Sequence, residues 1–142
     1  MQHMTTTQVK RLLGRYYDLP EMIRQEQQLL AELERERAAS ANDPQLIREI
    51  QHCRSRIVQC REEWNWCNAA LATLDRAQRC LLELAYMGPK DPQQRKTWTR
   101  TPSWKEIVQA VDYSKSRAQG KAKEALDKLC ALSGQESSSQ GS

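Results

Sequence analysis

The chain has 142 residues, of which 39% are hydrophobic and none is phenylalanine, and its mean hydropathy is −0.82. This composition excludes a large globular core, so we expect a thin helical assembly or one that completes its burial with a partner chain. The longest apolar runs are a few residues and no signal-peptide pattern opens the chain, which predicts no membrane segment and a cytoplasmic location. An odd cysteine count of five favours reduced thiols.

The net charge of +4 is unevenly distributed along the chain. Residues 1–87 carry 12 basic and 12 acidic side chains, whereas residues 88–142 carry 10 basic and 6 acidic ones. No acidic residue lies between Tyr113 and Lys123. This asymmetry is expected when one end of a protein contacts phosphates. An ordinary solvated basic face explains it equally well when it is taken alone.

The first forty residues predict two successive helices. Apolar side chains recur there at steps of three and four residues, as on one face of an α-helix, and Pro20 interrupts the pattern. Because the residue before a proline avoids helical geometry, we predict a short helix to about Tyr17 and a longer one to about Ala39. The apolar positions are Val9, Leu12, Tyr16, Leu19, Ile23, Leu30 and Leu33, with Glu26 in the one polar slot.

A longer helix follows a hinge at residues 40–43. Asp43 followed by Pro44 is typical of a helix start. The spacing of apolar residues then alternates four and three, as in a coiled-coil seam. This seam consists of Leu46, Ile50, Cys53, Ile57, Cys60, Trp64, Cys67, Leu71 and Leu74. A helix of this length, roughly 45 Å, needs a partner, which is either the preceding helix folded back antiparallel or the same seam of a second copy in a homodimer.

Neither a metal site nor catalysis is predicted. Cys53, Cys60 and Cys67 are seven residues apart, which separates neighbours by about 10 Å on a helix, so two of them cannot ligate one zinc ion. The two histidines, His3 and His52, stand in an N-terminal tail and on the coiled-coil helix. No glycine-rich phosphate loop, nucleophile elbow or paired carboxylates are present. We therefore expect no cofactor and no enzymatic activity.

Further helices are predicted after residue 74. Asp75 and Gln78 form a capping-box pattern, and the helix that they begin ends at Met87-Gly88-Pro89. Residues 88–102 are interpreted as an exposed basic loop, either an ordinary connection or a phosphate contact, and the basic residues are Lys90, Arg95, Lys96 and Arg100.

Residues 103–132 predict a helix-turn-helix. Ser103 and Glu106 form a second capping-box pattern, and Ser114 is the expected N-cap of a final helix that ends near Leu132. The expected buried positions are Trp104, Ile107, Val108 and Val111 in the first helix, and Ala118, Ala122, Ala125, Leu126 and Leu129 in the second. The predicted fold is all-α, with a coiled-coil-like helical hairpin (1–74), a helix-turn-helix domain (75–133) and a disordered low-complexity tail (134–142).

The predicted DNA contacts gather on the final helix, whose N-terminal half would enter the major groove. The residues expected nearest the base edges are Ser116, Arg117 and Gln119, and those expected at phosphates are Lys115, Lys121 and Lys123. Ser114, Gly120, Lys105 and Arg100 complete the predicted set. A glycine inside a helix costs about 1 kcal/mol relative to alanine, so Gly120 either permits close approach to DNA or only weakens the helix.

The segment from Leu74 to Leu132 resembles region 4 of bacterial sigma factors. The matching stretches are Leu81-Leu82-Glu83-Leu84-Ala85-Tyr86, Ser103-Trp104-Lys105-Glu106-Ile107, Tyr113-Ser114 and Ala125-Leu126 with Leu129. The whole chain resembles phage and prophage late-gene transcription regulators of Gram-positive bacteria, of the ArpU, RinA and LtrC type. The resemblance implies a double-stranded DNA-binding transcription regulator, with host RNA polymerase as a possible partner. Ala118 and Lys121 depart from the family pattern, which has a β-branched and an apolar residue at these positions.

A second hypothesis treats the chain as a protein-interaction module. In it the long hairpin binds RNA polymerase or another regulator and the basic face is incidental. The unbroken seam supports this hypothesis, together with an expected exposed Trp66 beside a buried Trp64. The two functions are compatible, since an activator needs both surfaces.

Overall fold

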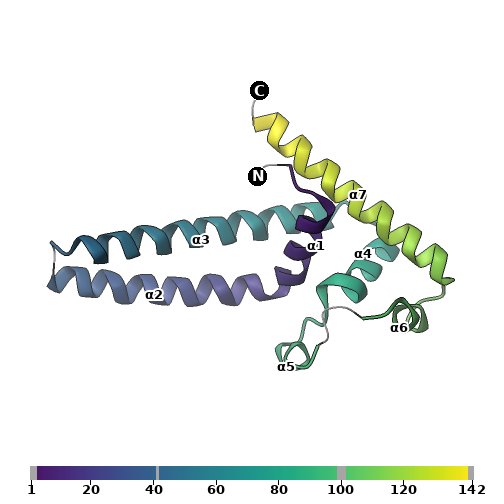
Figure 1. The fold of residues 1–142 in the computed structure, drawn as a ribbon, viewed down its shortest axis with the longest axis horizontal. Helices are drawn as coiled ribbons and strands as arrows, with labels where there is room; N and C mark the ends of the chain where they lie inside the picture. The colour runs from purple at the N-terminus through teal and green to yellow at the C-terminus, as the bar shows by residue number, and fades with distance from the viewer. Residues whose placement is uncertain (1–2, 41, 99–101, 141–142) are drawn as a thin grey trace. The chain divides into compact units, whose positions relative to one another are not determined.

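The computed structural model describes residues 3–40, 42–98 and 102–140, the last six of these by their backbone alone. The described part is helical and contains no strand, so the predicted all-α fold is confirmed. The elements in chain order (Figure 1) are α1 (Thr6–Arg15), the 3-10 turn η1 (Tyr16–Asp18), α2 (Leu19–Ala39), α3 (Pro44–Leu71), α4 (Arg76–Leu82), the π-helical turn η2 (Glu83–Met87), α5 (Pro92–Arg95), α6 (Trp104–Gln109) and α7 (Lys115–Gln140). None of the helices among these residues is long and apolar enough to cross a membrane.

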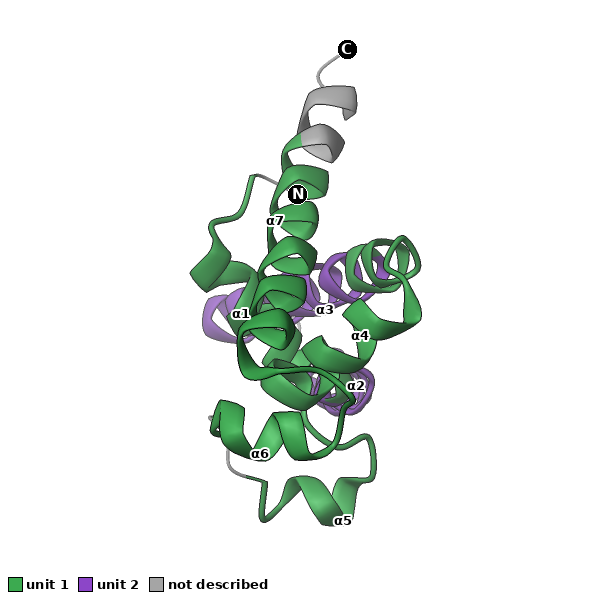
Figure 2. Cartoon of the chain, turned by 90° about the vertical axis from the view of Figure 1, so that its right-hand side faces the viewer, with its two compact units in different colours: residues 1–17, 66–142 green, residues 18–65 purple. Residues whose placement is uncertain are grey.

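The chain forms two compact units (Figure 2). Residues 18–65 make one of them, here called the hairpin unit, and residues 1–17 with 66–142 make the other, here called the α7 unit. The units do not divide at the boundary expected after residue 74. The first helix and the end of α3 belong with the C-terminal helices, because α1 packs against α7 and η2.

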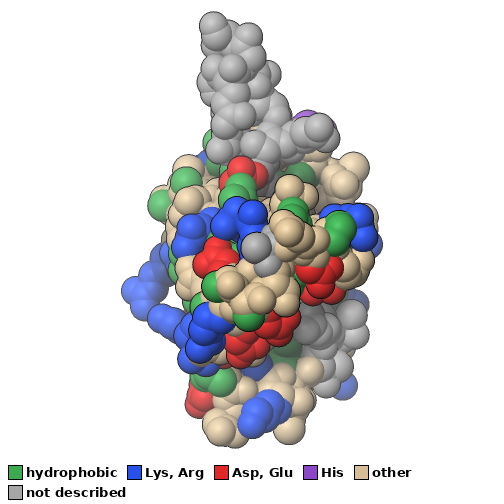
Figure 3. Space-filling view, turned by 90° about the vertical axis from the view of Figure 1, so that its left-hand side faces the viewer, with side chains coloured by type: hydrophobic (Ala, Val, Ile, Leu, Met, Phe, Trp, Pro, Cys, Tyr) green, Lys and Arg blue, Asp and Glu red, His purple; other side chains and the backbone are tan. Residues whose placement is uncertain are grey.

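The hairpin unit contains α2 and most of α3, which lie side by side (Figure 1). Asp43 begins α3, since its Oδ1 accepts hydrogen bonds from the backbone N–H groups of Gln45 (3.0 Å) and Leu46 (3.4 Å). The predicted seam faces α2, and its buried cluster is Leu33, Leu46, Ile50, Cys53 and Ile57, with Leu30 packed against it. Around the α2–α3 connection, which faces the viewer in Figure 3, acidic and basic side chains are interleaved.

Glu26, the polar residue in the apolar pattern of α2, is part of a small network. The Cys53 thiol donates to the Glu26 carbonyl oxygen (3.2 Å) and to its carboxylate Oε2 (3.3 Å), and Arg56 Nε donates to Oε1 (3.0 Å). The hydrogen bond from Arg56 lowers the pKa of Glu26. Burial, followed by the hydrogen bond to Glu26, raises the pKa of Cys53. The polar slot is therefore satisfied inside the seam.

Of the two tryptophans near the end of α3, Trp66 is more buried than predicted and Trp64 is less buried. Trp66 is buried, at 4% exposure, and Trp64 is only half-buried. Trp66 lies in the α7 unit, where Cys67, Ala70 and Leu71 are also buried. The seam prediction assumed that one partner helix covers α3 along its whole length. The last turns of α3 instead pack inside the α7 unit, which buries a different set of residues. The expectation of an exposed Trp66 is wrong.

The α7 unit begins with a tightly anchored N-terminal segment. Thr5 and Gln8 cap α1 reciprocally. The backbone N–H of Met4 donates to Ser133 Oγ (2.9 Å) in α7, and that hydroxyl donates to the Cys130 carbonyl oxygen (2.7 Å). Met4 and Ser133 are both buried. This contact fixes the N-terminal segment on the C-terminal half of α7.

The α4–η2 segment forms the middle of the α7 unit. Asp75 and Gln78 make the predicted capping box. The helical segment ends before Gly88, whose φ of +77° suits glycine. Tyr17 O–H donates to Glu83 Oε1 (3.0 Å), and burial together with this bond raises the pKa of Tyr17 to about 12. Tyr16 O–H donates to Asn68 Oδ1. These bonds join η1 to η2 and to the end of α3.

The final helix is longer than predicted. We expected it to end at Ser133-Gly134, before a disordered tail at 134–142, but α7 continues to Gln140. Gly134 and the polar residues after it suggested a helix end. In the structure Met4 binds Ser133 and the His3 ring lies beside Gly134, so the two residues expected to end the helix are packed against the N-terminal segment. The support is a long-range contact that the local sequence does not reveal.

Candidate nucleic-acid interface

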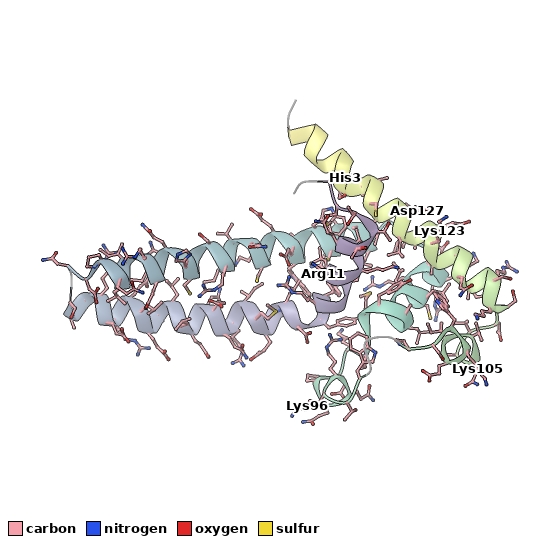
Figure 4. All side chains as sticks on the ribbon, viewed as in Figure 1. His3, Arg11, Lys96, Lys105, Lys123 and Asp127 are labelled. Atoms are coloured by element: carbon pink, nitrogen blue, oxygen red, sulfur yellow. The ribbon has the colours of Figure 1, made fainter. Side chains whose placement is uncertain are left out.

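The helix α6 is held by a cap and an apolar face. Ser103 Oγ accepts a hydrogen bond from the backbone N–H of Glu106 (3.3 Å). Ile107 is buried, and Trp104 and Val108 are partly buried against the same cluster. Ser103 thus forms the predicted N-cap through this one bond, and of the four residues predicted to be buried Ile107 is buried, whereas Trp104, Val108 and Val111 are half-buried. This packing leaves Lys105 exposed on the opposite side of α6 (Figure 4).

A short turn leads from α6 to α7. Ser114 caps α7 as predicted, because its Oγ accepts from the backbone N–H of Arg117 (3.3 Å) and its carbonyl oxygen accepts from that of Ala118 (2.9 Å). The five residues predicted to face inward are all buried, and they are Ala118, Ala122, Ala125, Leu126 and Leu129. Ala118 and Ala122 pack in one cluster with Leu81, Ala85 and Ile107. Small alanines at these positions let α7 lie close to its neighbours.

The opposite side of the first turns of α7 is open to solvent and basic. The exposed residues are Lys115, Ser116, Arg117, Gly120 and Lys123, and the half-buried ones are Gln119 and Lys121. Acidic residues follow immediately, since Glu124 and Asp127 are exposed, and Figure 4 shows Asp127 one turn beyond Lys123. The positive surface is therefore limited to about the first nine residues of the helix.

An aromatic ring organises two of these cations. The Arg117 guanidinium carbon lies 5.1 Å from the centre of the Tyr113 ring, and Lys121 Nζ lies 5.6 Å from the same centre. Tyr113 itself is half-buried and packs against the apolar cluster of α4, α6 and α7. Cation–π contacts of this kind contribute about 0.5–1 kcal/mol at exposed sites. Sequence reasoning placed Tyr113 in the turn but missed this contact, because Tyr113 precedes α7 and helical spacing does not fix the direction of its ring.

Gly120 lies among these exposed residues without any internal reason for a missing side chain. A Cβ placed there would meet nothing within 4 Å. The glycine therefore makes no room for a neighbouring part of the described chain. The two explanations that the sequence offers, close approach to DNA and simple weakening of the helix, both remain.

The basic segment after η2 differs from the open loop that was predicted. Arg95 is half-buried and donates to three backbone carbonyl oxygens, those of Met87 (2.7 Å), Pro89 (2.9 Å) and Gly14 (3.0 Å). Its guanidinium also lies over the rings of Tyr17 and Trp98. The interpretation of Arg95 as a solvent-exposed phosphate contact is wrong, because its donors are already used within the protein.

Other basic residues of this segment remain outward. Lys90 and Lys96 are exposed, and Figure 4 shows Lys96 at the end of α5. The predicted contact residue Arg100 lies outside the described residues. The segment next to Gly88 is closely packed, since a Cβ at Gly88 would lie 2.5 Å from the Trp98 ring.

The two units differ in charge. The α7 unit carries 15 basic and 8 acidic side chains, whereas the hairpin unit carries 7 basic and 10 acidic ones. The count along the sequence hid this difference because it grouped α1 with the hairpin. Residues 1–17 contain Lys10, Arg11 and Arg15 and no acidic residue. This difference in charge was the feature of the sequence that separates α1 from the hairpin unit.

No group of His, Cys, Asp and Glu side chains suited to holding a metal ion occurs among the residues that the structure places. Comparisons of the chain with protein-family models, with curated proteins and with solved structures gave no match.

Proposed function

We propose that this chain is a sequence-specific double-stranded DNA-binding protein that regulates transcription in the cytoplasm, with α6 and α7 acting as a helix-turn-helix. The N-terminal half of α7 enters the major groove, and Lys105 of α6 lies at the backbone. The proposal contains no catalytic step and no cofactor. The resemblance to sigma factor region 4 and to phage late-gene regulators supports a role at phage late promoters.

One observation carries the proposal: the first turns of α7 present exposed cations without an acidic residue, while the opposite face of the same helix is buried against α4, η2 and α6. A helix supported in this way can project rigidly into a groove. The acidic residues Glu124 and Asp127 restrict the contact to the N-terminal half, because phosphates repel carboxylates.

Salt-dependent binding tests the proposal. Each phosphate contact lowers the affinity about 3.5-fold between about 50 and 200 mM salt, so the four cations between residues 115 and 123 predict a fall of up to about 150-fold. Fluorescence anisotropy with labelled duplexes from a random-sequence pool measures this directly. Replacing Arg117 and Lys121 together by alanine should lower the logarithmic salt slope, by at most about half. The matched control is Arg61→Ala together with Arg48→Ala, two exposed cations of the hairpin unit. The absence of duplex binding at about 50 mM salt, or equal slopes in both double variants, would refute the proposal.

The hairpin unit supports a second candidate function, docking onto RNA polymerase or another regulator. Its excess of acidic side chains disfavours contact with DNA, and Val58, at 53% exposure, is an apolar side chain open to a partner. Binding of purified RNA polymerase that survives nuclease treatment and is weakened by Val58→Asp would favour it. Equal binding by Val58→Asp and by Gln51→Asp, an exposed polar control on the same helix, would remove Val58 from this role.

A further inference from the structure

We infer that Tyr113, Arg117 and Lys121 together form a clamp for one backbone phosphate of duplex DNA, and that the base edges are approached by a different stripe of α7. This inference rests on the proposed DNA-binding function and deepens it. It also moves Arg117 from the base-edge role that the sequence suggested to a phosphate role, and Lys123 from the suggested phosphate role to the stripe that faces the bases. Tyr113, which was not among the predicted contacts, becomes the positioning residue of the clamp.

The first support is the crowding of like charges. Arg117 and Lys121 both lie within 6 Å of the centre of one ring, at 5.1 and 5.6 Å. Among the residues that the structure describes, neither cation is paired with a carboxylate. Like charges four residues apart on a helix repel each other, and the ring compensates only part of this repulsion. An anion with several acceptor oxygens, such as a phosphate, would bind both cations at once.

The second support is the position of these residues around the helix. Successive residues turn by about 100°, so the buried residues Ala118, Ala122 and Leu129 define an inner side. Gly120 lies opposite that side, with Ser116 and Lys123 close to it. Arg117 and Lys121 lie on one flank, together with the ring of Tyr113. The exposed half of α7 therefore divides into an outer stripe, Ser116, Gly120 and Lys123, and a flank that carries the clamp.

The dimensions of DNA assign different partners to the two surfaces. A helix with its side chains is about 10–12 Å across, close to the roughly 12 Å width of the major groove. The outer stripe of an inserted helix faces the base edges, whereas its flanks face the walls of the groove, where the phosphates lie. The open space over Gly120 lets the helix backbone come near the bases, which fits this orientation.

The test separates the number of phosphate contacts from base preference. Binding-site selection from a random duplex pool gives the base preference of each variant, and a salt series gives the slope. For Arg117→Ala we expect weaker binding to every sequence by a similar factor and unchanged base preference. Lys121→Ala should behave in the same way. Because both cations hold one phosphate, the double variant Arg117→Ala with Lys121→Ala should lose about one phosphate contact, which makes it about 3.5-fold less sensitive than the wild type to a change from about 50 to 200 mM salt. Gly120→Ala should instead change the base preference with little change in slope.

The ring is tested by two substitutions of Tyr113. Tyr113→Phe keeps the aromatic face and should bind as the wild type does. Tyr113→Leu keeps an apolar side chain but removes the face, and should weaken binding about two- to fivefold on all sequences. Circular dichroism of both variants verifies that the fold is retained. If Tyr113→Leu unfolds, the Arg117→Ala and Lys121→Ala results alone decide the inference.

The outcomes distinguish this inference from the function on which it rests. If the wild-type protein binds no duplex at low salt, the proposed function is wrong. If it binds but Arg117→Ala relaxes the preference at one base position and the double variant leaves the slope unchanged, DNA binding stands and the clamp is wrong. Arg61→Ala, which removes one exposed cation from the hairpin unit, is the control and should change neither quantity.

Discussion

The hairpin unit and the α7 unit are held together by different kinds of contact. The hairpin unit repeats one arrangement, in which residues at regular steps along α2 and α3 meet in a single apolar cluster. The α7 unit depends on contacts between residues far apart in the sequence, such as Met4 with Ser133 and Gly14 with Arg95. A periodic pattern predicts the first kind of contact. It leaves the second kind undetermined, and with it the unit to which α1 belongs.

The largest effect that tests this comparison is expected from shortening a buried side chain of α1. Leu13 is fully buried in the α7 unit, so Leu13→Ala should lower the free energy of unfolding of that unit by about 3 kcal/mol. Tryptophan fluorescence during urea unfolding reports mainly on the α7 unit, which holds Trp66, Trp98 and Trp104. The matched control is Leu29→Ala in α2, where the leucine is 38% exposed and the expected loss is about 0.5 kcal/mol. Similar losses for both variants would contradict the assignment of α1.

A smaller effect is expected from Arg95, which bridges the α1 end of the α7 unit and the segment after η2. Arg95→Ala leaves three carbonyl oxygens without their donor, those of Gly14, Met87 and Pro89. A single hydrogen bond to a charged group contributes about 1.5–3 kcal/mol to stability. Because Arg95 is only half-buried and water can replace part of these bonds, we expect a loss of about 2 kcal/mol and faster amide hydrogen exchange around α5. Lys96→Ala, an exposed neighbour, is the control. Equal stability of the two variants would show that the bridge contributes nothing.

These two variants mark the limit of prediction from sequence. The starts of α3, α4, α6 and α7 could be predicted because their caps are local, from Asp43, Asp75, Ser103 and Ser114. The buried face of α7 could be predicted because alanines and leucines repeat at helical spacing. Arg95 could not be assigned, since a sequence gives no means of telling an arginine that binds distant carbonyl groups from one that faces solvent.

The same limit applies to the candidate interface. An acid-free basic stretch in the first turns of α7 was visible in the sequence, and so were the residues on its exposed side. The pairing of Arg117 and Lys121 with the Tyr113 ring was not predicted, because it depends on how the turn between α6 and α7 directs that ring. The burial of Trp66 was missed for a related reason, since the last turns of α3 leave the hairpin and pack in the α7 unit.

The contact between Glu26 and Arg56 in the hairpin unit is titratable, which predicts an acid-dependent loss of stability. Arg56 lowers the pKa of Glu26 below its ordinary value of 4.5. The folded state therefore binds the proton more weakly than the unfolded state, so the stabilisation is present above about pH 4.5 and is lost as the pH falls through the folded-state pKa. We expect about 1 kcal/mol, measured as the difference between wild type and Glu26→Gln in urea unfolding from pH 7 to pH 3. Glu62→Gln, at an exposed position of α3, should follow the wild-type pH profile. If Glu26→Gln follows it as well, the network does not stabilise the hairpin.

The smallest expected effect concerns Gly120, and it has opposite signs for stability and for binding. Because a Cβ at this position meets nothing within 4 Å, Gly120→Ala should raise the stability of the α7 unit by about 0.7 kcal/mol through helix propensity. Gly134, in the same helix, is the matched control, since its Cβ would lie 2.9 Å from His3 Nδ1 and the gain there should be reduced or absent. A glycine kept only by chance would give a more stable protein with unchanged DNA binding. A glycine that lets the outer stripe approach base edges would give a more stable protein that binds duplex DNA less tightly, and this second result is the one that we expect.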